Sequence, residues 1–312
     1  MHMLTLAFCT YNRADRLERL ITAMRTQRCP VPFEILAVNN NSPDNTLEIL
    51  GRLAKEPGPP LRIVTESVQG IVSARNRAIA ESLDSDILVF MDDDELPLPG
   101  LIESAYHAIV NEGAECAGGK VSMDFSHHAR PAWLGDELLG FLAAVDYGDE
   151  PFWIQDTSTP VWTANVAYDM RLFRNDPDLR FDKRYDRKGN VVGGGSDAIM
   201  FRTLLERKVR LRYCPGMAVL HAVEPWRLKR RYFLKLHYRA GVRRGRHQLP
   251  DYPKKLFGIP SFLFNQFLRQ SIKILTMQMQ GKSGYLRQAM NAAHALGTII
   301  GYAKRGRAGN NE

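Results

Sequence analysis

The stretch Ile87-Leu88-Val89-Phe90-Met91-Asp92-Asp93-Asp94-Glu95 decides the fold prediction. Its first five residues are apolar and typical of a short buried strand, and four carboxylates follow directly. Like charges at contact distance raise one another's pKa, so a bound Mg²⁺ or Mn²⁺ would relieve the repulsion. In open α/β sheets ligands bind beyond the carboxyl ends of the strands, where Asp92 to Asp94 would lie. The alternative is a solvated acidic turn that caps a helix beginning near Pro99.

Strands and helices alternate on both sides of this stretch. Upstream, strands are expected at Leu4–Cys9, Glu34–Val38 and Leu61–Val64, and helices near residues 17–24, 46–55 and 73–83. Downstream, the sequence predicts a helix from Pro99 to Asn111, a strand at Cys116–Met123, and closing strands at Arg210–Tyr213 and Ala218–His221. This alternation is typical of a parallel, doubly wound sheet with right-handed crossovers.

The predicted strand ends carry polar side chains instead of glycine-rich phosphate loops. No G-x-G-x-x-G follows the first strand, and no G-x-x-x-x-G-K-[ST] occurs in the chain. The polar segments are Thr10–Arg13, Asn39–Asp44, Arg75–Asn76 and Asp92–Glu95. We therefore expect side chains and a metal ion to hold any nucleotide at this edge.

Two later segments are candidates for an acceptor site. Trp162-Thr163-Ala164-Asn165 would suit a sugar pocket, although core packing is the safer interpretation of most aromatic side chains in this region. Gly193-Gly194-Gly195-Ser196-Asp197 opens a predicted helix, where Ser196 or Asp197 is either a cap or lies beside a ligand that the glycines admit. His221, taken alone, indicates a hydrogen-bonded core histidine more than a ligand.

The composition is that of an ordinary folded protein with a basic excess. The 312 residues are 45% hydrophobic and 24% charged, and the net charge is +8. A pI near 9.3 favours a polyanionic partner. Four widely spaced cysteines predict reduced core thiols in a cytoplasm. We expect neither a signal peptide nor a membrane-spanning stretch.

The last part of the chain is basic and helical. Helices are predicted from Leu228 to Arg244, after Pro260, and over Tyr285–Ala303, and no acidic residue lies between Glu224 and Asp251. Aromatic and aliphatic faces beside clustered arginines suit a helix at an anionic membrane surface. The alternative is a helical subdomain that packs on the core or forms a dimer.

The strand-end residues, in this order, resemble the family 2 glycosyltransferases, which have the GT-A fold. The resemblance covers roughly Met3 to His221. It rests on five motifs in chain order: T-Y-N-R at Thr10–Arg13, V-D-N-x-S-x-D-x-T at Val38–Thr46, G-x-x-x-A-R-N at Gly70–Asn76, D-x-D at Asp92–Asp94 and G-G-x-D at Gly194–Asp197.

The resemblance implies a nucleotide-sugar site at the strand ends. Thr10 and Asn39 would lie near the base and ribose, and Arg75 would bind the diphosphate. The remaining nucleotide-sugar residues would be Tyr11, Asn12, Arg13, Asn41, Asp92 and Asp93.

The resemblance also implies a metal and a base. Asp92 would contact the ribose or the metal, Asp94 would bind the metal, and His221 would approach the metal or the phosphates. Asp197 would be the catalytic base that takes the proton from the acceptor hydroxyl, with inversion at the anomeric carbon. The acceptor-side residues would be Trp162, Asn165, Gly194, Gly195 and Ser196.

Two residues depart from the family pattern. Asn39 stands where the family usually has an aspartate that accepts from a uracil nitrogen, which leaves the nucleotide base open. Ser196 replaces the common glutamate before the base, which removes a second carboxylate from the acceptor side.

The sequence therefore predicts an α/β fold of GT-A type, with a mostly parallel central sheet flanked by helices and a C-terminal helical region. The expected domains are a catalytic region at 1–225, with a nucleotide-sugar half at about 1–115 and an acceptor half at about 116–225, a helical region at 226–304, and a disordered tail at 305–312.

The predicted function is inverting, metal-dependent glycosyl transfer with Mg²⁺ or Mn²⁺. The donor would be a nucleoside-diphosphate sugar, with UDP favoured, and the acceptor a lipid-linked glycan of cell-surface polysaccharide synthesis. The protein would be peripheral at the inner face of the cell membrane and would not bind nucleic acid; the C-terminal helices would allow an oligomer. The alternatives are a sugar-nucleotide nucleotidyltransferase, a non-catalytic nucleic-acid- or membrane-binding protein, and a silent scaffold.

Overall fold

The chain divides into two compact units. One contains residues 1–189 and 196–223, and the other contains residues 190–195 and 224–312. The computed structural model describes residues 3–187, 195–280 and 284–305. The predicted domain limits at 225 and 304, and the two halves of the catalytic region, stay predictions.

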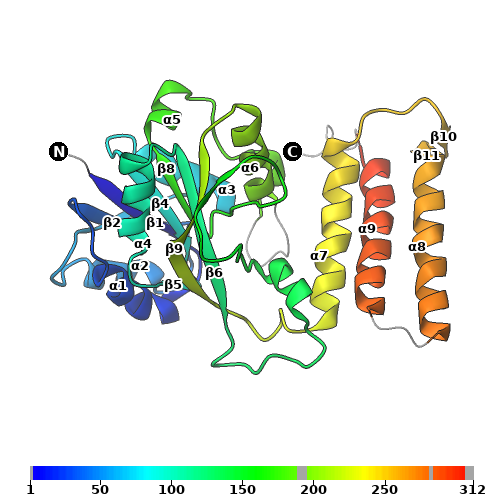
Figure 1. Cartoon of the computed structure of the whole chain (residues 1–312), viewed down its shortest axis with the longest axis horizontal. Helices are drawn as coiled ribbons and strands as arrows, with labels where there is room; N and C mark the ends of the chain where they lie inside the picture. The colour runs from blue at the N-terminus through cyan, green and yellow to red at the C-terminus, as the bar shows by residue number, and fades with distance from the viewer. Residues whose placement is uncertain (1–2, 188–194, 281–283, 306–312) are drawn as a thin grey trace. The chain divides into compact units, whose positions relative to one another are not determined.

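A nine-stranded sheet forms the centre of the first unit (Figure 1). Its order is β3-β2-β1-β4-β8-β6-β9-β5, and β7 pairs with β9. The strands are β1 Leu4–Thr10, β2 Phe33–Asn39, β3 Leu61–Thr65, β4 Ile87–Asp92, β5 Glu95–Pro97, β6 Cys116–Asp124, β7 Phe152–Ile154, β8 Asn165–Asp169 and β9 Leu211–Ala222.

Six strands run in one direction and three oppose them. β1, β2, β3 and β4 are mutually parallel, β8 is antiparallel to β4 and β6, and β9 is parallel to β6. β5 and β7 are antiparallel to β9. The prediction of a mostly parallel sheet flanked by helices is confirmed.

The order in which successive strands are added to the sheet changes direction beside β1. From β1 the chain moves through β2 to β3 at one edge, then returns to place β4 on the other side of β1. Ligands of open α/β sheets bind where the strand order reverses, here at the carboxyl ends of β1 and β4. The helical segments are η1 Ala14–Arg16, α1 Leu17–Arg25, α2 Thr46–Leu53, α3 Ile71–Glu81, α4 Leu101–Tyr106, η2 His107–Asn111, η3 Asp136–Leu142, α5 Arg171–Asn175, η4 Lys183–Tyr185 and α6 Ser196–Glu206.

Two features of the sheet differ from the sequence prediction. β8 lies between β4 and β6. No strand was expected in the aromatic-rich region from His127 to Tyr168, because all five residues of β8 are buried and the strand shows no alternation of apolar and polar residues. The two expected closing strands form the single strand β9. Pro215 and Gly216 are unfavourable inside a strand, but the register shift between Gly119 and Lys120 of β6 accommodates them.

The second unit is built from three long helices. These are α7 Arg230–Arg243, which continues as the π-helical turn η5 Arg244–Gln248, α8 Ser261–Met279 and α9 Tyr285–Ala303. The short strands β10 Lys255–Leu256 and β11 Ile259–Pro260 form a hairpin before α8. The predicted C-terminal helical region is therefore present. The expected tail lies outside the described residues except for Arg305, whose Nη1 donates to the Pro250 carbonyl oxygen at 2.9 Å.

Glycines bring the backbones of α7 and α9 into direct contact. A Cβ atom added at Gly241 would lie 2.0 Å from the carbonyl oxygen of His294, and one at Gly297 would lie 2.0 Å from that of Tyr238. Gly245 and Gly301, each four residues further along, make the same kind of approach. This is the close packing that small residues at i and i+4 allow.

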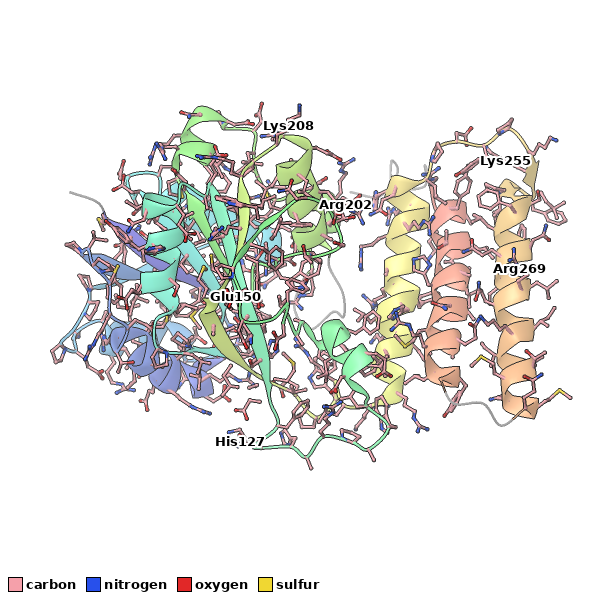
Figure 2. The ribbon with its side chains drawn as sticks, viewed as in Figure 1. His127, Glu150, Arg202, Lys208, Lys255 and Arg269 are labelled. Carbon is pink, nitrogen blue, oxygen red and sulfur yellow. The ribbon has the colours of Figure 1, made fainter. Side chains whose placement is uncertain are left out.

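The helix α8 contacts α9 on one side and exposes the other. Leu263 packs with Ile299 and Tyr302 of α9, whereas Arg269 is exposed (Figure 2). Within the described ranges, no helix combines the length and apolar character needed to cross a bilayer.

Candidate active site

The carboxyl ends of β1, β2 and β4 bring predicted nucleotide-binding residues to one edge of the sheet. Thr10 is in register with Asn39 on β2, and Cys9 is in register with Asp92 on β4. Because β1 lies between the other two strands, Asn39 and Asp92 flank its end. This edge is also where the strand order reverses.

The turns after β1 and β2 are joined by hydrogen bonds. The backbone N–H of Asn12 donates to Ser42 Oγ at 3.0 Å, and the N–H of Ser42 donates to Asn39 Oδ1 at 3.1 Å. Asn12 and Asn41 both have φ of 56°, a left-handed conformation that asparagine tolerates. Tyr11 and Arg13 adjoin Asn12. The Asn39 oxygen that would accept from a base therefore already accepts from its own turn.

Asn40 is a buried residue that the sequence did not single out. Its Oδ1 accepts from the N–H of Gly70 at 2.8 Å, and its Nδ2 donates to the Val68 carbonyl oxygen at 2.8 Å. It ties the loop after β2 to the loop before α3. Asn40 matches the N of the V-D-N-x-S-x-D-x-T motif, but the motif does not reveal that this side chain joins two loops.

Arg75 of α3 joins two carboxylates from opposite sides of the predicted site. Its Nη1 donates to Asp197 Oδ1 at 2.8 Å, and its Nη2 donates to Asp92 Oδ1 at 3.3 Å. The side chain is only 6% exposed. Burial alone would lower the pKa of Arg75, but the charges of Asp197 and Asp92 raise it above the ordinary value. In this structure the Arg75 guanidinium, which was expected to bind the diphosphate, instead binds the carboxylates of Asp197 and Asp92.

Asp197 lies in the first turn of α6 and is fixed by two donors. Besides Arg75, the backbone N–H of Thr163 donates to its Oδ1 at 3.3 Å. Burial would raise the pKa of Asp197, but the Arg75 charge and the bonds from Thr163 lower it. The carboxylate is therefore ionised at neutral pH. Thr163 was not predicted as a site residue, because a backbone donor leaves no signature in the sequence.

The other acceptor-side candidates have mixed surroundings. Ser196 is buried, with Oγ 3.4 Å from Arg75 Nη1. Gly195 has φ of +114°, which favours glycine, and Gly194 lies outside the described residues. Trp162 is half-buried. Asn165 is buried and its Nδ2 donates to the carbonyl oxygens of Lys120 and Met217, so it binds the sheet backbone.

The acidic stretch after β4 places two carboxylates beside His221. Asp94 Oδ2 lies 3.6 Å from His221 Nε2, and Glu95 Oε1 lies 3.4 Å from His221 Nδ1. Glu95 is buried, accepts from the N–H of Asp92 at 2.9 Å, and faces His221 across the β5–β9 pair. Burial raises the pKa of Glu95 to about 8, although the hydrogen bond with His221 opposes the shift. The fourth carboxylate thus belongs to the interior.

Asp93 completes the stretch. Burial and the nearby Asp94 charge raise its pKa, while the Thr10 hydroxyl opposes the shift. Thr10 and Asp93 therefore lie near each other at the carboxyl ends of β1 and β4, where both were predicted to bind the nucleotide sugar.

Asp94 and His221 offer ligands that suit a divalent ion. Carboxylate oxygen and imidazole nitrogen are both accepted by Mn²⁺, and Mg²⁺ is commonly held by one or two carboxylates together with substrate phosphates. Over residues 3–187, 195–280 and 284–305, no group of three or more His, Cys, Asp or Glu side chains is arranged to hold a metal. The donor set fits a metal whose remaining ligands come from a diphosphate.

Asp186 and Asp182, two other aspartates that could serve as the base, have structural partners. Asp186 Oδ1 accepts from the N–H of Val72 at 2.9 Å at the start of α3. A Cβ atom at Gly70 would lie 1.9 Å from Asp186 Oδ2, so a glycine is needed there. Asp182 pairs with Arg184 at 2.6 Å.

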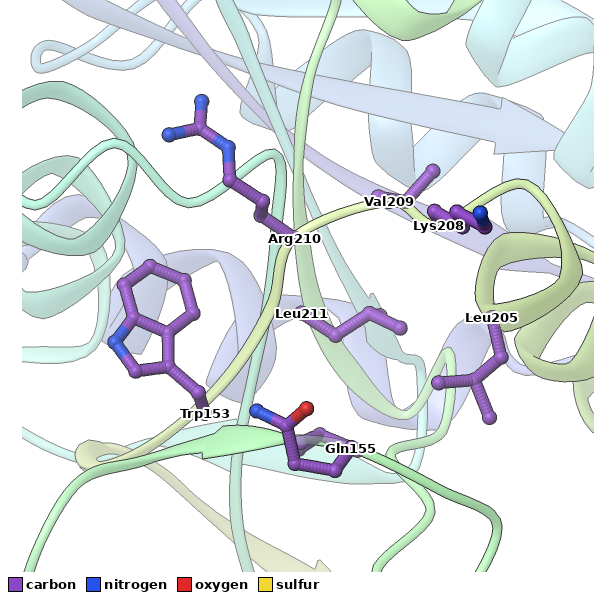
Figure 3. Close-up of a pocket in the computed structure, with 8 residues that line it drawn as sticks. Trp153, Gln155, Leu205, Lys208, Val209, Arg210 and Leu211 are labelled. Atoms are coloured by element: carbon purple, nitrogen blue, oxygen red, sulfur yellow. The ribbon is translucent and has the colours of Figure 1, made fainter.

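A pocket lined by Trp153, Lys208 and Leu211, among others, lies away from this site (Figure 3). Leu211 begins β9, whereas His221, which faces Asp94, lies near its end. Since β9 runs in the same direction as β4, the pocket is at the amino edge of the sheet. It does not include any predicted site residue.

Comparisons of sequence agree on one family. The family model described as "Glycosyl transferase family 2" matches residues 5–205. The chain is 29% identical over 116 residues to "Glycosyltransferase AglE" of Haloferax volcanii, covering 37% of this chain and 38% of that protein. It is 30% identical over 102 residues to "Uncharacterized glycosyltransferase YfnE" of Bacillus subtilis, covering 33% and 26%. The matches thus span well under half of these relatives.

Comparisons of structure show the fold. S. aureus TarS 1–349, solved in complex with UDP-GlcNAc, superposes with a TM-score of 0.54 at 15% identity, covering 80% of this chain and 68% of that chain. GalNAc-T7, solved with UDP, GalNAc and Mn²⁺, superposes with a TM-score of 0.56 at 14% identity, covering 80% and 52%.

Proposed function

The chain belongs to glycosyl transferase family 2, and we propose that it is an inverting, metal-dependent enzyme that uses a nucleoside-diphosphate sugar, most readily a UDP-sugar. The observation that carries the proposal is the position of Arg75, which contacts Asp92 at the end of β4 and Asp197 at the start of α6. One residue thereby links the predicted donor side to the predicted acceptor side. UDP or UDP-GlcNAc in the TarS structures supports the choice of donor.

The donor would occupy the edge formed by Thr10, Asn39 and Asp92. Because the oxygen of Asn39 accepts from Ser42, recognition of the base would depend on the surrounding turn as well as on this side chain. The diphosphate would lie nearer Asp94 and His221. There a bound Mg²⁺ or Mn²⁺ would offset the charge that builds on the departing nucleoside diphosphate. Asp94, Asp92 and His221 would hold this ion.

Arg75 would exchange partners when the donor binds. Its fork is matched to two anionic oxygens and now faces two carboxylates, so a diphosphate would compete for the same donors. Turning toward the diphosphate would release Asp197. The freed carboxylate is then able to accept the proton of a hydroxyl that attacks the anomeric carbon from the face opposite the leaving group, which inverts the configuration.

The acceptor would be a hydroxyl of a glycan, lipid-linked and destined for cell-surface polysaccharide, bound by the half of the catalytic region from about residue 116 to 225. We place the protein in the cytoplasm, at the inner face of the cell membrane. The acid-free basic run from Arg227 to Arg246 supports this location, because anionic headgroups attract such segments.

The proposal is tested by nucleotide binding and transfer. A thermal-shift panel of nucleoside diphosphates, with and without Mn²⁺, should show the largest rise in melting temperature for UDP with Mn²⁺, because a ligand that binds only the native state stabilises it more the more tightly it binds. Transfer of sugar from the identified donor should then invert the anomeric configuration of the product. Retention of configuration would contradict the mechanism, and the absence of any nucleotide-dependent shift would contradict the donor class.

A further inference from the structure

The outer side of α8 carries a row of exposed apolar side chains. Leu268, Ile272, Leu275 and Met279 are 58, 50, 59 and 87% exposed. Their spacings of four, three and four residues place them on one face of the helix. A different face packs on α9 through Leu263. We call the four exposed residues the apolar stripe.

The apolar stripe belongs to a strongly cationic part of the chain. Asp251 is the one acidic residue in the sequence between Glu224 and Glu312, and it pairs with Lys255 at 2.6 Å. The helix α8 itself contains Arg269 and Lys273, both exposed, and no acidic residue. An apolar row beside basic side chains on one helix is the pattern of a helix that lies in a membrane interface.

The basic helix α7 lacks such an apolar face. Tyr232 and Phe233, two of the aromatic residues of this helix, are buried. The glycines of α7 face α9. Its basic side chains could attract headgroups, but Tyr232 and Phe233 are not available to enter a bilayer, and Leu236 and Tyr238 are half-buried.

We propose that the apolar stripe of α8 enters the interface of a bilayer containing anionic lipid. The inference rests on the proposed membrane location and names the surface that provides it. The four stripe side chains would leave water for the acyl boundary, while Arg269 and Lys273 would extend to the phosphates of the headgroups. Since none of the described helices is long and apolar enough to span the membrane, α8 lies along its surface.

A second copy of the chain fits this face less well than a lipid surface. Pairing two stripes would bring Arg269 and Lys273 of each copy together, with no acidic residue on α8 to offset them. A stable protein interface also needs about 800 Å² from each partner, with a substantial apolar core. One row of four side chains is narrow for that purpose, whereas an anionic surface matches both its width and its charge.

Vesicle sedimentation of the full chain tests the assignment. The vesicles are phosphatidylcholine alone or with about a third phosphatidylglycerol. The parent should bind only the anionic vesicles. Leu268→Ser with Leu275→Ser should reduce the partition coefficient at least about tenfold, because the two leucines lose the transfer of their apolar surface. The matched control is Leu47→Ser with Val110→Ser, two exposed apolar residues of the first unit, and it should bind as the parent does.

A second variant tests the charge. Arg269→Gln with Lys273→Gln should weaken binding to anionic vesicles about tenfold and make the remainder less sensitive to salt. Binding that is lost only when Arg230, Arg231, Arg243 and Arg244 are changed to serine would overturn the assignment in favour of α7. Absence of vesicle binding by the parent would overturn it, as would a dimer that the leucine variant makes monomeric in sedimentation velocity.

The test separates this inference from the proposed function. Nucleotide binding by calorimetry, and transfer to a soluble acceptor glycan, should be unchanged in the leucine variant. If both persist while vesicle binding also persists, the surface is wrong and the activity stands. If nucleotide binding fails in the parent, the activity is wrong whatever the vesicles show.

Discussion

At the scale of single residues, Arg75 is the centre of the candidate site. It holds Asp92 and Asp197 with one guanidinium, and both contacts would change when a diphosphate enters. The adjacent Asn76 has a purely structural partner, since its side chain exchanges two hydrogen bonds with the backbone of Phe181 at 2.9 Å each. The sequence resemblance includes both Arg75 and Asn76. Only the structure shows that Arg75 faces the candidate site and that Asn76 holds a loop.

Asp197→Asn should separate binding from transfer. The amide keeps the shape of the carboxylate and removes the proton acceptor, so we expect transfer to be at least about a hundredfold slower. The nucleotide–metal complex should bind at least as tightly as to the parent, because Arg75 loses one competing carboxylate. Calorimetry and a transfer assay measure the two effects. Asp182→Asn is the control, and near-parental turnover of Asp197→Asn would move the base to another residue.

Asp94→Asn tests the metal. We expect Mn²⁺-dependent UDP binding to weaken about tenfold or more, because a charged ligand is lost while the fold is retained. The measurement is UDP calorimetry with Mn²⁺ and with chelator. The fully exposed Asp156→Asn should match the parent. Equal metal dependence in Asp94→Asn and the parent would show that the ion binds elsewhere.

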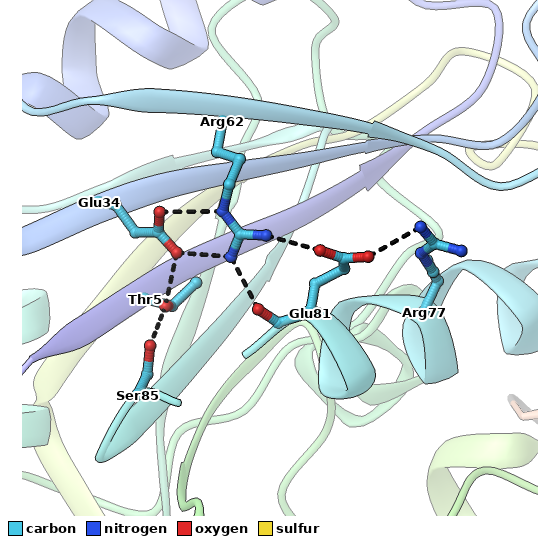
Figure 4. Close-up of polar contacts among 6 residues, drawn as sticks. All are labelled: Thr5, Glu34, Arg62, Arg77, Glu81 and Ser85. Carbon is cyan, nitrogen blue, oxygen red and sulfur yellow. Dashed lines mark hydrogen bonds and ion pairs between the residues drawn. The ribbon is translucent and has the colours of Figure 1, made fainter. Parts of the chain in front are cut away.

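At the scale of elements, a polar cluster ties β1, β2 and β3 to α3 at the amino edge of the sheet (Figure 4). Arg62 binds Glu34 through two hydrogen bonds of 2.7 and 3.0 Å and binds Glu81 at 2.8 Å. Glu34 also accepts from the buried Thr5 hydroxyl at 3.1 Å. The cluster fixes the strands at the edge opposite the site, and so sets where their carboxyl ends meet.

Arg62→Met should lower the free energy of unfolding by about 2 kcal/mol, because it leaves the buried Glu34 carboxylate without its main donor. Arg77→Met, which removes a single more exposed pair with Glu81, should cost less than about 0.5 kcal/mol. Urea unfolding measures both. Equal effects would mean that the cluster contributes no more than a surface ion pair.

The stability of the packed helices α7 and α9 should fall at acidic pH. Burial, followed by the charges of Arg244, His237 and Arg243, lowers the pKa of His294 to about 4. The folded state therefore favours neutral His294, whose ordinary pKa is about 6.5. The stability that this preference contributes is complete above about pH 6.5 and is lost as the pH falls toward 4. His294→Gln should show a smaller drop in melting temperature between pH 7 and pH 5 than the parent, and an equal drop would contradict the assignment.

At the scale of the whole molecule, the elements with a clear local signal were predictable and those made by distant pairing were not. The first four strands, the three C-terminal helices and the order of the site motifs follow from hydrophobic runs and polar strand ends. β8 could not be predicted, because its place depends on β4 and β6 far away in the chain. The inward turn of Glu95 likewise depends on His221, over a hundred residues later.

The sequence indicates which candidate site residues lie at the ends of the strands, but it does not reveal the partners of their side chains. Thr10, Asn39 and Asp92 meet at one edge as the parallel strands require. The bond from Ser42 to Asn39, the hold of Arg75 on Asp197 and the role of Asn165 in the sheet all depend on partners that a linear sequence does not reveal. The roles proposed for these residues remain predictions, and the variants above test them.

β8 pairs with β4 but follows it far along the chain, which has a consequence for folding during synthesis on the ribosome. Residues 3–124 complete β1 to β6, but the open edge of β4 is filled only when Asn165–Asp169 has emerged. Until then a nascent chain carries an apolar strand with unpaired backbone groups, which is a surface that aggregates or recruits chaperones. A chain truncated before residue 165 would keep this edge of β4 unpaired, so we expect such a fragment to aggregate.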